Sequence, residues 1–145
     1  MPVITPFTPK HLEAVAVLEL QAGDVQWSRA QFEKELSLSI SRFVVFVEGD
    51  AVWGYGGYWS VAGEAQITNL VIAPDHRRQG WGSQLLQHLL TEARREGCQR
   101  ATLEVRIGNS TARTLYRHAG FRKTGLRARA YTNPPETAVL MEKVL

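Results

Sequence analysis

The segment 72–83 combines two adjacent arginines, Arg77 and Arg78, with two closely spaced glycines, Gly80 and Gly82. It joins an apolar run predicted as a strand to an amphipathic run predicted as a helix. The first N–H groups of a helix have no partner within it, and the helix dipole favours an anion at that end. Glycine lets the backbone approach a ligand, and arginine adds positive charge and forked donors. We therefore predict a phosphate-binding loop, against the alternative of an ordinary turn whose arginines are solvated.

The composition indicates one globular domain. The chain has 145 residues, of which 44% are hydrophobic and 21% charged, enough for a buried core, and we expect the domain to span residues 1–145. No apolar run is long enough to cross a membrane and no secretory leader pattern opens the chain, so a cytoplasmic protein without a membrane partner is expected. The formal net charge of +3 favours an anionic partner such as a nucleotide cofactor, an acidic peptide or RNA.

Sequence signals in the first part of the chain predict an edge strand and two helices. Residues 3–4 are a short apolar start next to prolines, which suits an edge strand. Thr8, followed by a proline, has the form of a helix N-cap. Ser28 and Gln31 form a capping box for the second helix. An apolar repeat of four residues predicts that the buried face of this helix continues to about Ile40.

The rest of the chain alternates between strand and helix signals. Strands are predicted over residues 43–47, 51–60, 65–72, 101–107 and 138–144, with one more from Phe121 onward and a loop over 131–136. The helix after the arginine-glycine loop stops at Gly97, and a short helix capped by Asn109 or Ser110 follows the strand at 101–107. The order β-α-α-β-β-β-α-β-α-β-β predicts a mixed sheet in an α/β domain.

The pattern Arg77-x-x-Gly80-x-Gly82, placed after a strand and before a helix, resembles the acetyl-CoA pyrophosphate loop of the GCN5-related N-acetyltransferase (GNAT) family. The predicted order of elements matches that family over essentially the whole chain. Within the family the chain is most similar to the RimI type, which acetylates the N-terminal alanine of a small-subunit ribosomal protein. The residues that carry this likeness are Trp27, Ser28, Asn69, Ala73, Pro74, Asp75, Leu103, Glu104, Val105, Arg106, Asn109, Leu115, Tyr116, Gly120 and Phe121.

The resemblance implies the GNAT fold, a mixed and mostly antiparallel sheet of six to seven strands with about four helices and splayed central strands. The pantetheine arm of acetyl-CoA would enter this splay. There the backbone of Leu70, Val71 and Ile72 would pair with the arm, and one N–H would polarise the thioester carbonyl. The pyrophosphate would be held by Arg77, Arg78, Gln79, Gly80, Trp81, Gly82 and Ser83. Asn109 matches a further cofactor contact, with capping of the short helix as the alternative.

Two residues of the matched region could supply acid–base chemistry. An α-amino group has a pKa near 8, so a base must remove its proton before it attacks the acetyl thioester. The resemblance implies that Glu104 accepts this proton and that Tyr116 protonates the departing thiolate. The alternatives are a surface glutamate paired with Arg106 or another cation, and a core tyrosine on the apolar side of its helix.

The acceptor side of the chain departs from the RimI pattern. The likeness implies that Trp27 and Tyr131 bind the acceptor. However, Gln26 stands where a proline is usual, Ala130 replaces one of two tyrosines, and residues 133–136 replace a glycine-arginine-glutamate-aspartate run. The predicted function is transfer of acetyl to a protein N-terminal amine, with a ribosomal protein as the candidate partner. The alternatives are a lysine or small-molecule amine as acceptor, or a non-catalytic acyl-CoA-binding domain.

Other classes of function lack their sequence signals. The four histidines show no metal-ligand spacing, so no metal is expected. The chain has no aromatic, glycine-rich RNA-binding consensus, so direct binding of nucleic acid is not expected. The single cysteine, Cys98, follows a helix end without a nearby histidine, and it is expected to be buried and unreactive.

Overall fold

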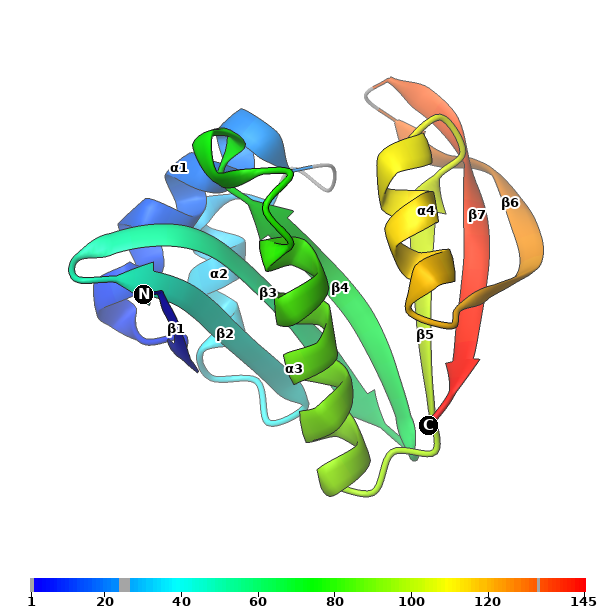
Figure 1. Ribbon diagram of the computed structural model, residues 1–145, viewed down its shortest axis with the longest axis horizontal. Helices are drawn as coiled ribbons and strands as arrows, with labels where there is room; N and C mark the ends of the chain where they lie inside the picture. Colours follow the sequence, from blue (N-terminus) through cyan, green and yellow to red (C-terminus); the bar gives the residue numbers. More distant parts are fainter. Residues whose placement is uncertain (1, 24–26, 133) are drawn as a thin grey trace.

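Seven strands form a sheet in the order β1-β2-β3-β4-β5-β7-β6 (Figure 1). The computed structural model describes residues 2–23, 27–132 and 134–145. The strands are β1 (Val3–Pro6), β2 (Ser41–Glu48), β3 (Ala51–Val61), β4 (Glu64–Ile72), β5 (Arg100–Arg106), β6 (Arg122–Thr132) and β7 (Pro135–Val144). The helices are α1 (Leu12–Ala22), α2 (Arg29–Glu35), α3 (Trp81–Arg95) and α4 (Ser110–His118), with 3-10 turns η1 (Pro9–His11) and η2 (Pro74–His76). The predicted mixed, mostly antiparallel sheet with about four helices is confirmed.

The central strands β4 and β5 separate soon after they meet. They form the parallel pair of the sheet, and they pair at three positions, the last being Gln66 opposite Thr102. Beyond that point β4 continues to pair with β3 as far as Ile72, while β5 continues with β7 to Arg106. The two strands therefore diverge in a V (Figure 1), as the expected splay requires.

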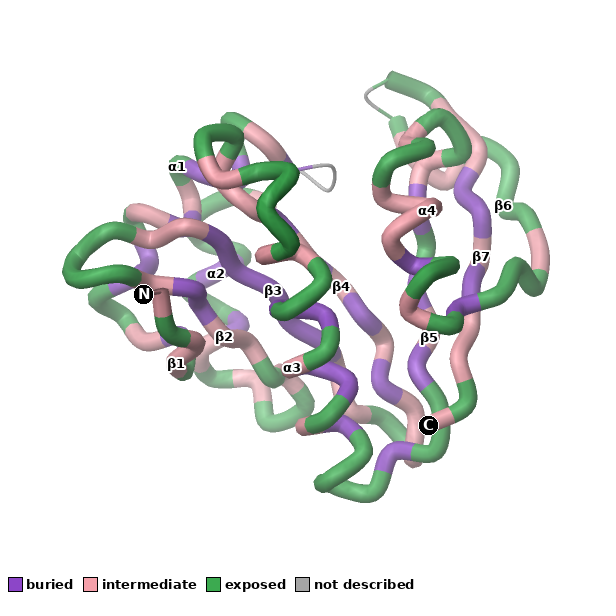
Figure 2. Tube along the Cα trace, in the orientation of Figure 1, coloured by how far each residue is buried: buried purple, intermediate pink, exposed green. Residues whose placement is uncertain are grey.

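Helices cover both faces of the sheet, with α3 and α4 on one face and α1 and α2 on the other (Figure 1). Buried residues run along the strands beneath each layer (Figure 2). The α3–α4 face contains Tyr58, Leu86, Leu89, Leu90, Leu103, Val105 and Tyr116. The α1–α2 face contains Leu12, Val15, Leu18, Phe32, Val45, Tyr55 and Val71. Because successive residues of a strand point to opposite faces, each central strand can present side chains to both layers.

The helix starts follow the predicted capping signals. Thr8 is the N-cap of η1, the short turn that leads into α1. The N–H of Gln31 donates to Ser28 Oγ at 3.2 Å, and the N–H of Ser28 donates to Gln31 Oε1 at 2.7 Å, which completes the capping box. Asn109 rather than Ser110 caps α4. The side chains of Ser28 and Asn109 accept from helix N–H groups that have no partner within the helix, whereas at Thr8 it is the backbone carbonyl that accepts, from the N–H of His11 at 2.9 Å.

Helix α2 ends earlier than its apolar repeat predicts. It stops at Glu35, and Ile40 is 36% exposed, so the expectation of a buried face to about Ile40 is wrong. The N–H groups of Ser37 and Leu38 bond to carbonyls three residues back, which is the tighter 3-10 pattern. The hydroxyl of Ser37 also donates to the carbonyl of Lys34 at 3.1 Å, and such local bonding competes with the helix.

Candidate active site

The loop between β4 and α3 has a backbone shaped to bind an anion. Arg78 has φ of +62° and Gly80 has φ of +86°, and no side chain of the described residues caps the start of α3. Left-handed residues in such turns direct successive N–H groups into one concavity, next to the unpartnered N–H groups of the helix. The Nε of Arg77 donates to the carbonyl of Ile72 at 3.2 Å. This bond fastens the loop to the end of β4, with both arginines exposed at the helix mouth.

Aromatic rings hold the same loop against the sheet. The ring of Trp81 packs edge-on against Phe46 and Trp53, with centroids 5.5 and 5.8 Å apart. His76 stacks on Trp53 with centroids 3.7 Å apart and an interplanar angle of 8°. The indole N–H of Trp81 donates to Gln79 Oε1 at 2.9 Å. Because its side chain is packed in this way, Trp81 would contact a bound anion through its backbone N–H. Trp53 and His76, which hold the loop, were not selected from the sequence, because no local pattern there points to this stacking.

Leu70, Val71 and Ile72 form the β4 side of the splay. They pair with residues 54–56 of β3, and within the described residues β5 offers them no ladder partner. Alternate backbone groups of such a strand point away from its partner, so N–H and C=O groups of this stretch face the space between β4 and β5. The side chain of Leu70 packs on the α3–α4 face and that of Val71 on the α1–α2 face. An extended ligand can therefore pair with the backbone while the side chains serve packing.

Glu104 and Tyr116, the two acid–base candidates, lie on opposite faces of the sheet. Leu103 and Val105 point into the α3–α4 cluster, so Glu104 points to the other face. Tyr116 of α4 belongs to the α3–α4 cluster with 8% of its surface exposed. Its ring meets Phe121 in a T-shaped contact with centroids 5.8 Å apart. The carboxylate and the phenol therefore approach β5, one edge of the splay, from its two faces.

Glu104 forms a two-pronged ion pair with Arg127 of β6. The Nε of Arg127 donates to Oε1 at 2.6 Å and its Nη2 donates to Oε2 at 3.0 Å. The hydrogen bonds and the charge of Glu104 raise the pKa of the Arg127 guanidinium. Pairing with a cation was the alternative considered for Glu104, and its partner is Arg127. A carboxylate oxygen has two acceptor sites, so this pair leaves acceptor capacity for a water or an amine.

Arg106, named in the sequence as a partner for Glu104, instead holds the tip of the β6–β7 hairpin. Its guanidinium carbon lies 4.2 Å from the centroid of the Tyr131 ring, and its Nη1 donates to Glu136 Oε1 at 3.3 Å. The other carboxylate oxygen of Glu136 accepts from the N–H of Gly108 at 2.7 Å. The predicted loop over 131–136 is largely wrong because Tyr131 belongs to β6 and Glu136 to β7. Asn133 of that loop and Gln26 lie outside the described residues.

An open cleft of about 790 Å³ lies on the face to which Glu104 points. It is lined by Trp27, Trp59, Gln66, Ile67, Thr68, Thr102, Leu103, Glu104, Arg106, Thr124, Arg127, Ala130, Tyr131, Thr132, Leu140 and Met141. The cleft therefore brings together both predicted acceptor residues and the predicted base. Its volume lies within the range of small-ligand sites. Trp59 and Arg127 also line it, and sequence reasoning selected neither.

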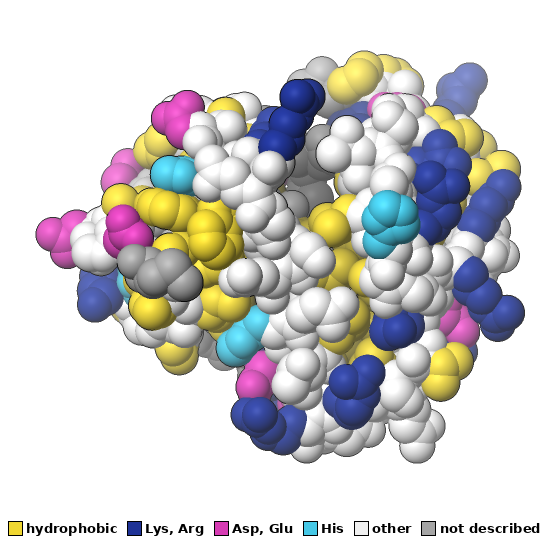
Figure 3. All heavy atoms as spheres, in the orientation of Figure 1, with side chains coloured by type: hydrophobic (Ala, Val, Ile, Leu, Met, Phe, Trp, Pro, Cys, Tyr) yellow, Lys and Arg dark blue, Asp and Glu magenta, His cyan; other side chains and the backbone are white. Residues whose placement is uncertain are grey.

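Asn109 acts as a helix cap in this structure. Its Oδ1 accepts from the N–H of Ala112 at 3.1 Å, which is the capping alternative considered for it. The role of Asn109 as a cofactor contact stays a prediction. Lys and Arg side chains gather on the right of the face shown in Figure 3, where Figure 1 has α4 and β6, and these two elements contain Arg113, Arg117 and Arg122.

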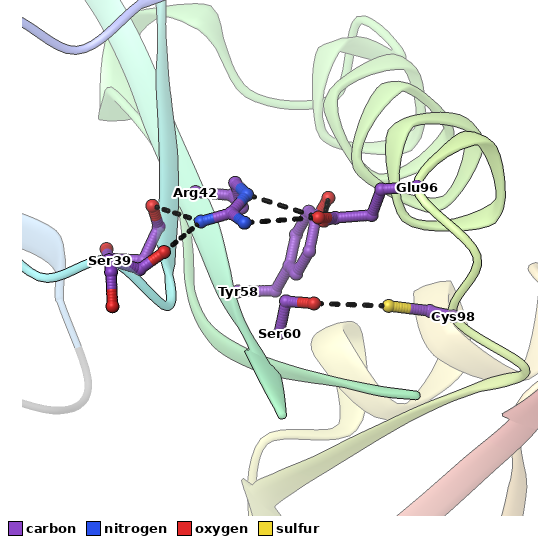
Figure 4. A network of polar contacts seen from close by, with 7 residues as sticks. Ser39, Arg42, Tyr58, Ser60, Glu96 and Cys98 are labelled. Atoms are coloured by element: carbon purple, nitrogen blue, oxygen red, sulfur yellow. Dashed lines mark hydrogen bonds and ion pairs between the residues drawn. The ribbon is translucent and has the colours of Figure 1, made fainter. Parts of the chain in front are cut away.

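Helix α3 is tied to the sheet at the end opposite to the arginine-glycine loop. Glu96 accepts from the hydroxyl of Tyr58 and from Nη2 of Arg42 at 3.2 Å (Figure 4). Burial and the bond to Glu96 raise the pKa of Tyr58, so its hydroxyl keeps its proton.

Cys98 is buried as predicted, with its sulfur 3.6 Å from the Ser60 hydroxyl. No helix of the described residues has the length and apolar character needed to cross a membrane.

A sheet whose central strands splay apart, with exposed arginines and left-handed residues in the loop before α3, is the arrangement expected of an acyl-CoA-dependent transferase. Residues 12–121 match the acetyltransferase (GNAT) family, and the chain belongs to this family of acetyl-CoA-dependent N-acetyltransferases.

Among proteins of known sequence, the chain is similar to the ribosomal protein bS18-alanine N-acetyltransferase of Escherichia coli K12. The identity is 30% over 143 residues, which cover 97% of this chain and 96% of that protein. It is also 33% identical over 117 residues to the N-alpha-acetyltransferase RimI of Mycobacterium tuberculosis, covering 78% of this chain and 72% of that protein. The crystal structure of the E. coli ribosomal-protein-S18-alanine N-acetyltransferase superposes with a TM-score of 0.90 at 28% identity, covering 99% of this chain and 94% of that one.

Proposed function

We propose that this protein transfers acetyl from acetyl-CoA to the α-amino group of a protein N-terminus. The candidate acceptor is the N-terminal alanine of a ribosomal protein, as in the name of its E. coli relative. The observation that carries the proposal is the cleft of about 790 Å³ in which Glu104, Trp27 and Tyr131 meet. An acceptor that is a ribosomal protein would place the enzyme in the cytoplasm. The cleft is a surface for a peptide end, and direct contact with nucleic acid is not part of the proposal.

The donor would be held at two places on the chain. The exposed arginines and the backbone N–H groups of residues 77–83 would hold the pyrophosphate. The open backbone of residues 70–72 would pair with the pantetheine arm. This fit rests on the left-handed Arg78 and Gly80 and on the missing ladder partner along β4. Nothing lies within 4 Å of where a Cβ on Gly80 would stand, so a ligand can approach the backbone there.

Acid–base chemistry would be divided between the two faces of the sheet. Bound acetyl-CoA supplies an acetyl thioester. A carboxylate oxygen of Glu104 would take a proton from the acceptor ammonium, directly or through a water. The nitrogen lone pair then forms the C–N bond as the C–S bond breaks, and the Tyr116 hydroxyl would give its proton to the departing sulfur. An α-amino group has a pKa near 8, so an exposed, ion-paired carboxylate can assist its deprotonation at neutral pH. A lysine side chain has a pKa near 10.4 and would need a stronger base.

A competition between acceptors tests this proposal. One peptide would carry a free N-terminal alanine, a second would be blocked at its N-terminus and carry an internal lysine, and spermidine would represent small amines. Because lysine holds its proton more tightly by about 2.4 pKa units, we expect kcat/KM for the free N-terminus to exceed that for lysine by about 10²-fold. Equal turnover of the blocked peptide or of spermidine would overturn the proposed acceptor. Binding of CoA by calorimetry without turnover of any acceptor would indicate a non-catalytic domain.

A further inference from the structure

Two buried carboxylates stand behind the aromatic wall of the cleft. Glu35, in the last turn of α2, is 8% exposed and Glu19, in α1, is fully buried. Neither forms an ion pair with a basic residue of the described chain. A carboxylate withdrawn from water is costly unless hydrogen bonds replace its hydration, so the groups that bond to these two residues show what each one holds in place.

Glu35 holds the indole of Trp59. Its Oε1 accepts from Trp59 Nε1 at 2.7 Å and from the Ser41 hydroxyl at 2.8 Å. Trp59 is half-buried and lines the cleft. The ring is therefore fixed by a charge-assisted bond at its edge, which leaves it as a rigid surface for a ligand.

Glu19 holds the neighbouring tryptophan by its backbone. Its Oε2 accepts from the N–H of Trp27 at 3.1 Å, and its Oε1 accepts from the hydroxyl of Tyr55. The rings of Trp27 and Trp59 then stack with centroids 6.2 Å apart and an interplanar angle of 24°. One wall of the cleft is thus a pair of indoles, each fastened to its own buried carboxylate.

The register of the sheet relates this wall to the predicted base. Trp59 pairs with Gln66, and Gln66 pairs with Thr102, so the three form one row across β3, β4 and β5. Glu104 lies two residues beyond Thr102 on the same face. At about 4.8 Å per strand and about 3.3 Å per residue, Glu104 and Trp59 would be about 12 Å apart in a regular sheet, and the splay of β5 from β4 beyond Thr102 adds to this distance. An acceptor whose amine is at Glu104 spans about 7 Å to its third residue, so a large side chain on its second or third residue is needed to cover the rest of the distance to Trp59.

The charges in the cleft favour a neutral side chain at that point. The charged residues among its lining are Arg106, Arg127 and Glu104, and Glu104 is already paired with Arg127. An aromatic face can attract a cation, but both arginines are already paired, Arg106 with Glu136 and Arg127 with Glu104, and the carboxylate of Glu35 is buried and bonded to Trp59 and Ser41. A basic side chain would therefore lose hydration at this point without gaining an uncommitted acidic partner among the described residues that line the cleft. A large apolar or aromatic side chain instead gains stacking on Trp59 without this loss.

We propose that Trp59, positioned by Glu35, is a specificity-determining residue that selects acceptor N-termini with an aromatic or large apolar side chain at the second or third residue over those with lysine or arginine. This inference rests on the proposed function. Glu35 is a positioning residue and takes no part in the acetyl transfer itself.

The test is a panel of peptides with a free N-terminal alanine and either phenylalanine, leucine or lysine at the second and third residues. For the wild type we expect kcat/KM with phenylalanine to exceed that with lysine by about tenfold, the scale of one well-packed apolar contact. Trp59→Ala and Glu35→Ala should reduce this preference to within about twofold by raising KM for the phenylalanine peptide, with KM for acetyl-CoA unmoved. Glu35→Gln keeps an acceptor oxygen for the indole and should retain most of the preference.

Glu33→Ala is the matched control, because Glu33 is an exposed residue of the same helix and the preference should not change. CoA binding by calorimetry reports whether each variant is folded. If Trp59→Ala does not bind CoA, Trp59→Phe, which keeps a ring but loses the bond to Glu35, and Glu35→Ala decide the outcome. A wild type that acetylates these peptides without preferring phenylalanine, or folded variants that keep the preference, would overturn this inference alone. A wild type that acetylates no free N-terminus would overturn the proposed function instead.

Discussion

The part of the sheet from β1 to β4 and the part from β5 to β7 share a hydrophobic cluster, but their backbones pair at three positions, between β4 and β5, and the two parts carry opposite charge. Residues 1–99 contain eight basic and eleven acidic residues, whereas residues 100–145 contain nine basic and three acidic ones. The first part holds the arginine-glycine loop and the two tryptophans of the cleft. The second part holds Glu104, Arg127, Tyr116 and Tyr131. Under the proposed function, the residues that bind the pyrophosphate of acetyl-CoA therefore belong to the first part, and the acid–base residues belong to the second. The reaction would take place between the two parts, in the splay.

The outer edges of the two parts are also protected in different ways. On one side β1 has four residues and ends at Pro6, and a short strand that ends in proline is a poor template for another strand. On the other side β6 has eleven residues, most of them exposed, and it carries Arg122, Lys123, Arg127 and Arg129. Positive charge along an edge resists pairing with a second chain. Arg127 thus has two roles: it pairs with Glu104, and it adds to the positive charge that protects the edge strand β6.

The largest expected effect comes from removing the predicted base in the second part. Glu104→Gln should lower kcat by about 10² to 10⁴-fold, the range for loss of a positioned general base, while the affinity for acetyl-CoA stays the same. Steady-state kinetics with a free N-terminal peptide and calorimetry with CoA would measure both. Glu142→Gln on β7 is the control and should leave kcat unchanged. If the Glu104→Gln enzyme kept wild-type turnover, Glu104 would not be the base, and the assignment of acid–base chemistry to the second part of the sheet would be wrong.

A smaller and complementary effect is expected in the first part. Replacing both Arg77 and Arg78 with alanine should raise KM for acetyl-CoA by about 10 to 100-fold, because charge-assisted bonds to a phosphate are lost, and KM for the acceptor should change little. The same double replacement of Arg94 and Arg95, at the other end of α3, is the control. If the acceptor KM rose together with that of acetyl-CoA, the division between the two parts would fail.

The smallest effect concerns the response of the two parts to acid. The ring of His11 in the first part accepts from the N–H of Thr8 at 3.0 Å, and burial lowers its pKa below the usual 6.5. The unfolded chain therefore takes up a proton near pH 6.5 that the folded chain resists, so stability falls as the pH drops through that value. Thermal unfolding between pH 7.5 and 5.5 should show a loss of less than about 1 kcal/mol from this group. His11→Gln should flatten the dependence, whereas His118→Gln, at an exposed position of α4, should not.

The arrangement of elements could be predicted because its signals are local. Caps such as Ser28 and Asn109 and the turn at Gly97 act within a few residues, and the family resemblance supplied the splay. The early end of α2 was missed because the apolar repeat continues past Glu35, whereas the hydroxyl of Ser37 bonds to the carbonyl of Lys34, a local alternative to the helix that the repeat does not reveal. The partner of Glu104 was missed because Arg127 reaches it diagonally across β7, and strand register is not readable from composition. Trp59 and Glu35 are 24 residues apart in the chain, and neither has a pattern that points to the other.

The splay also gives the sheet an edge in its interior. A strand edge normally lies on the outside of a fold, where it can recruit another chain, but here β4 is open toward β5 and covered by helices on both faces. A pantetheine arm lying along it would act as a temporary eighth strand and join two parts whose backbones otherwise pair at three positions. Any ligand that binds only the folded state adds to its stability in proportion to the logarithm of its concentration. The free energy of unfolding would therefore rise with the concentration of acetyl-CoA, and the two parts of the sheet would be held together most firmly when acetyl-CoA is bound.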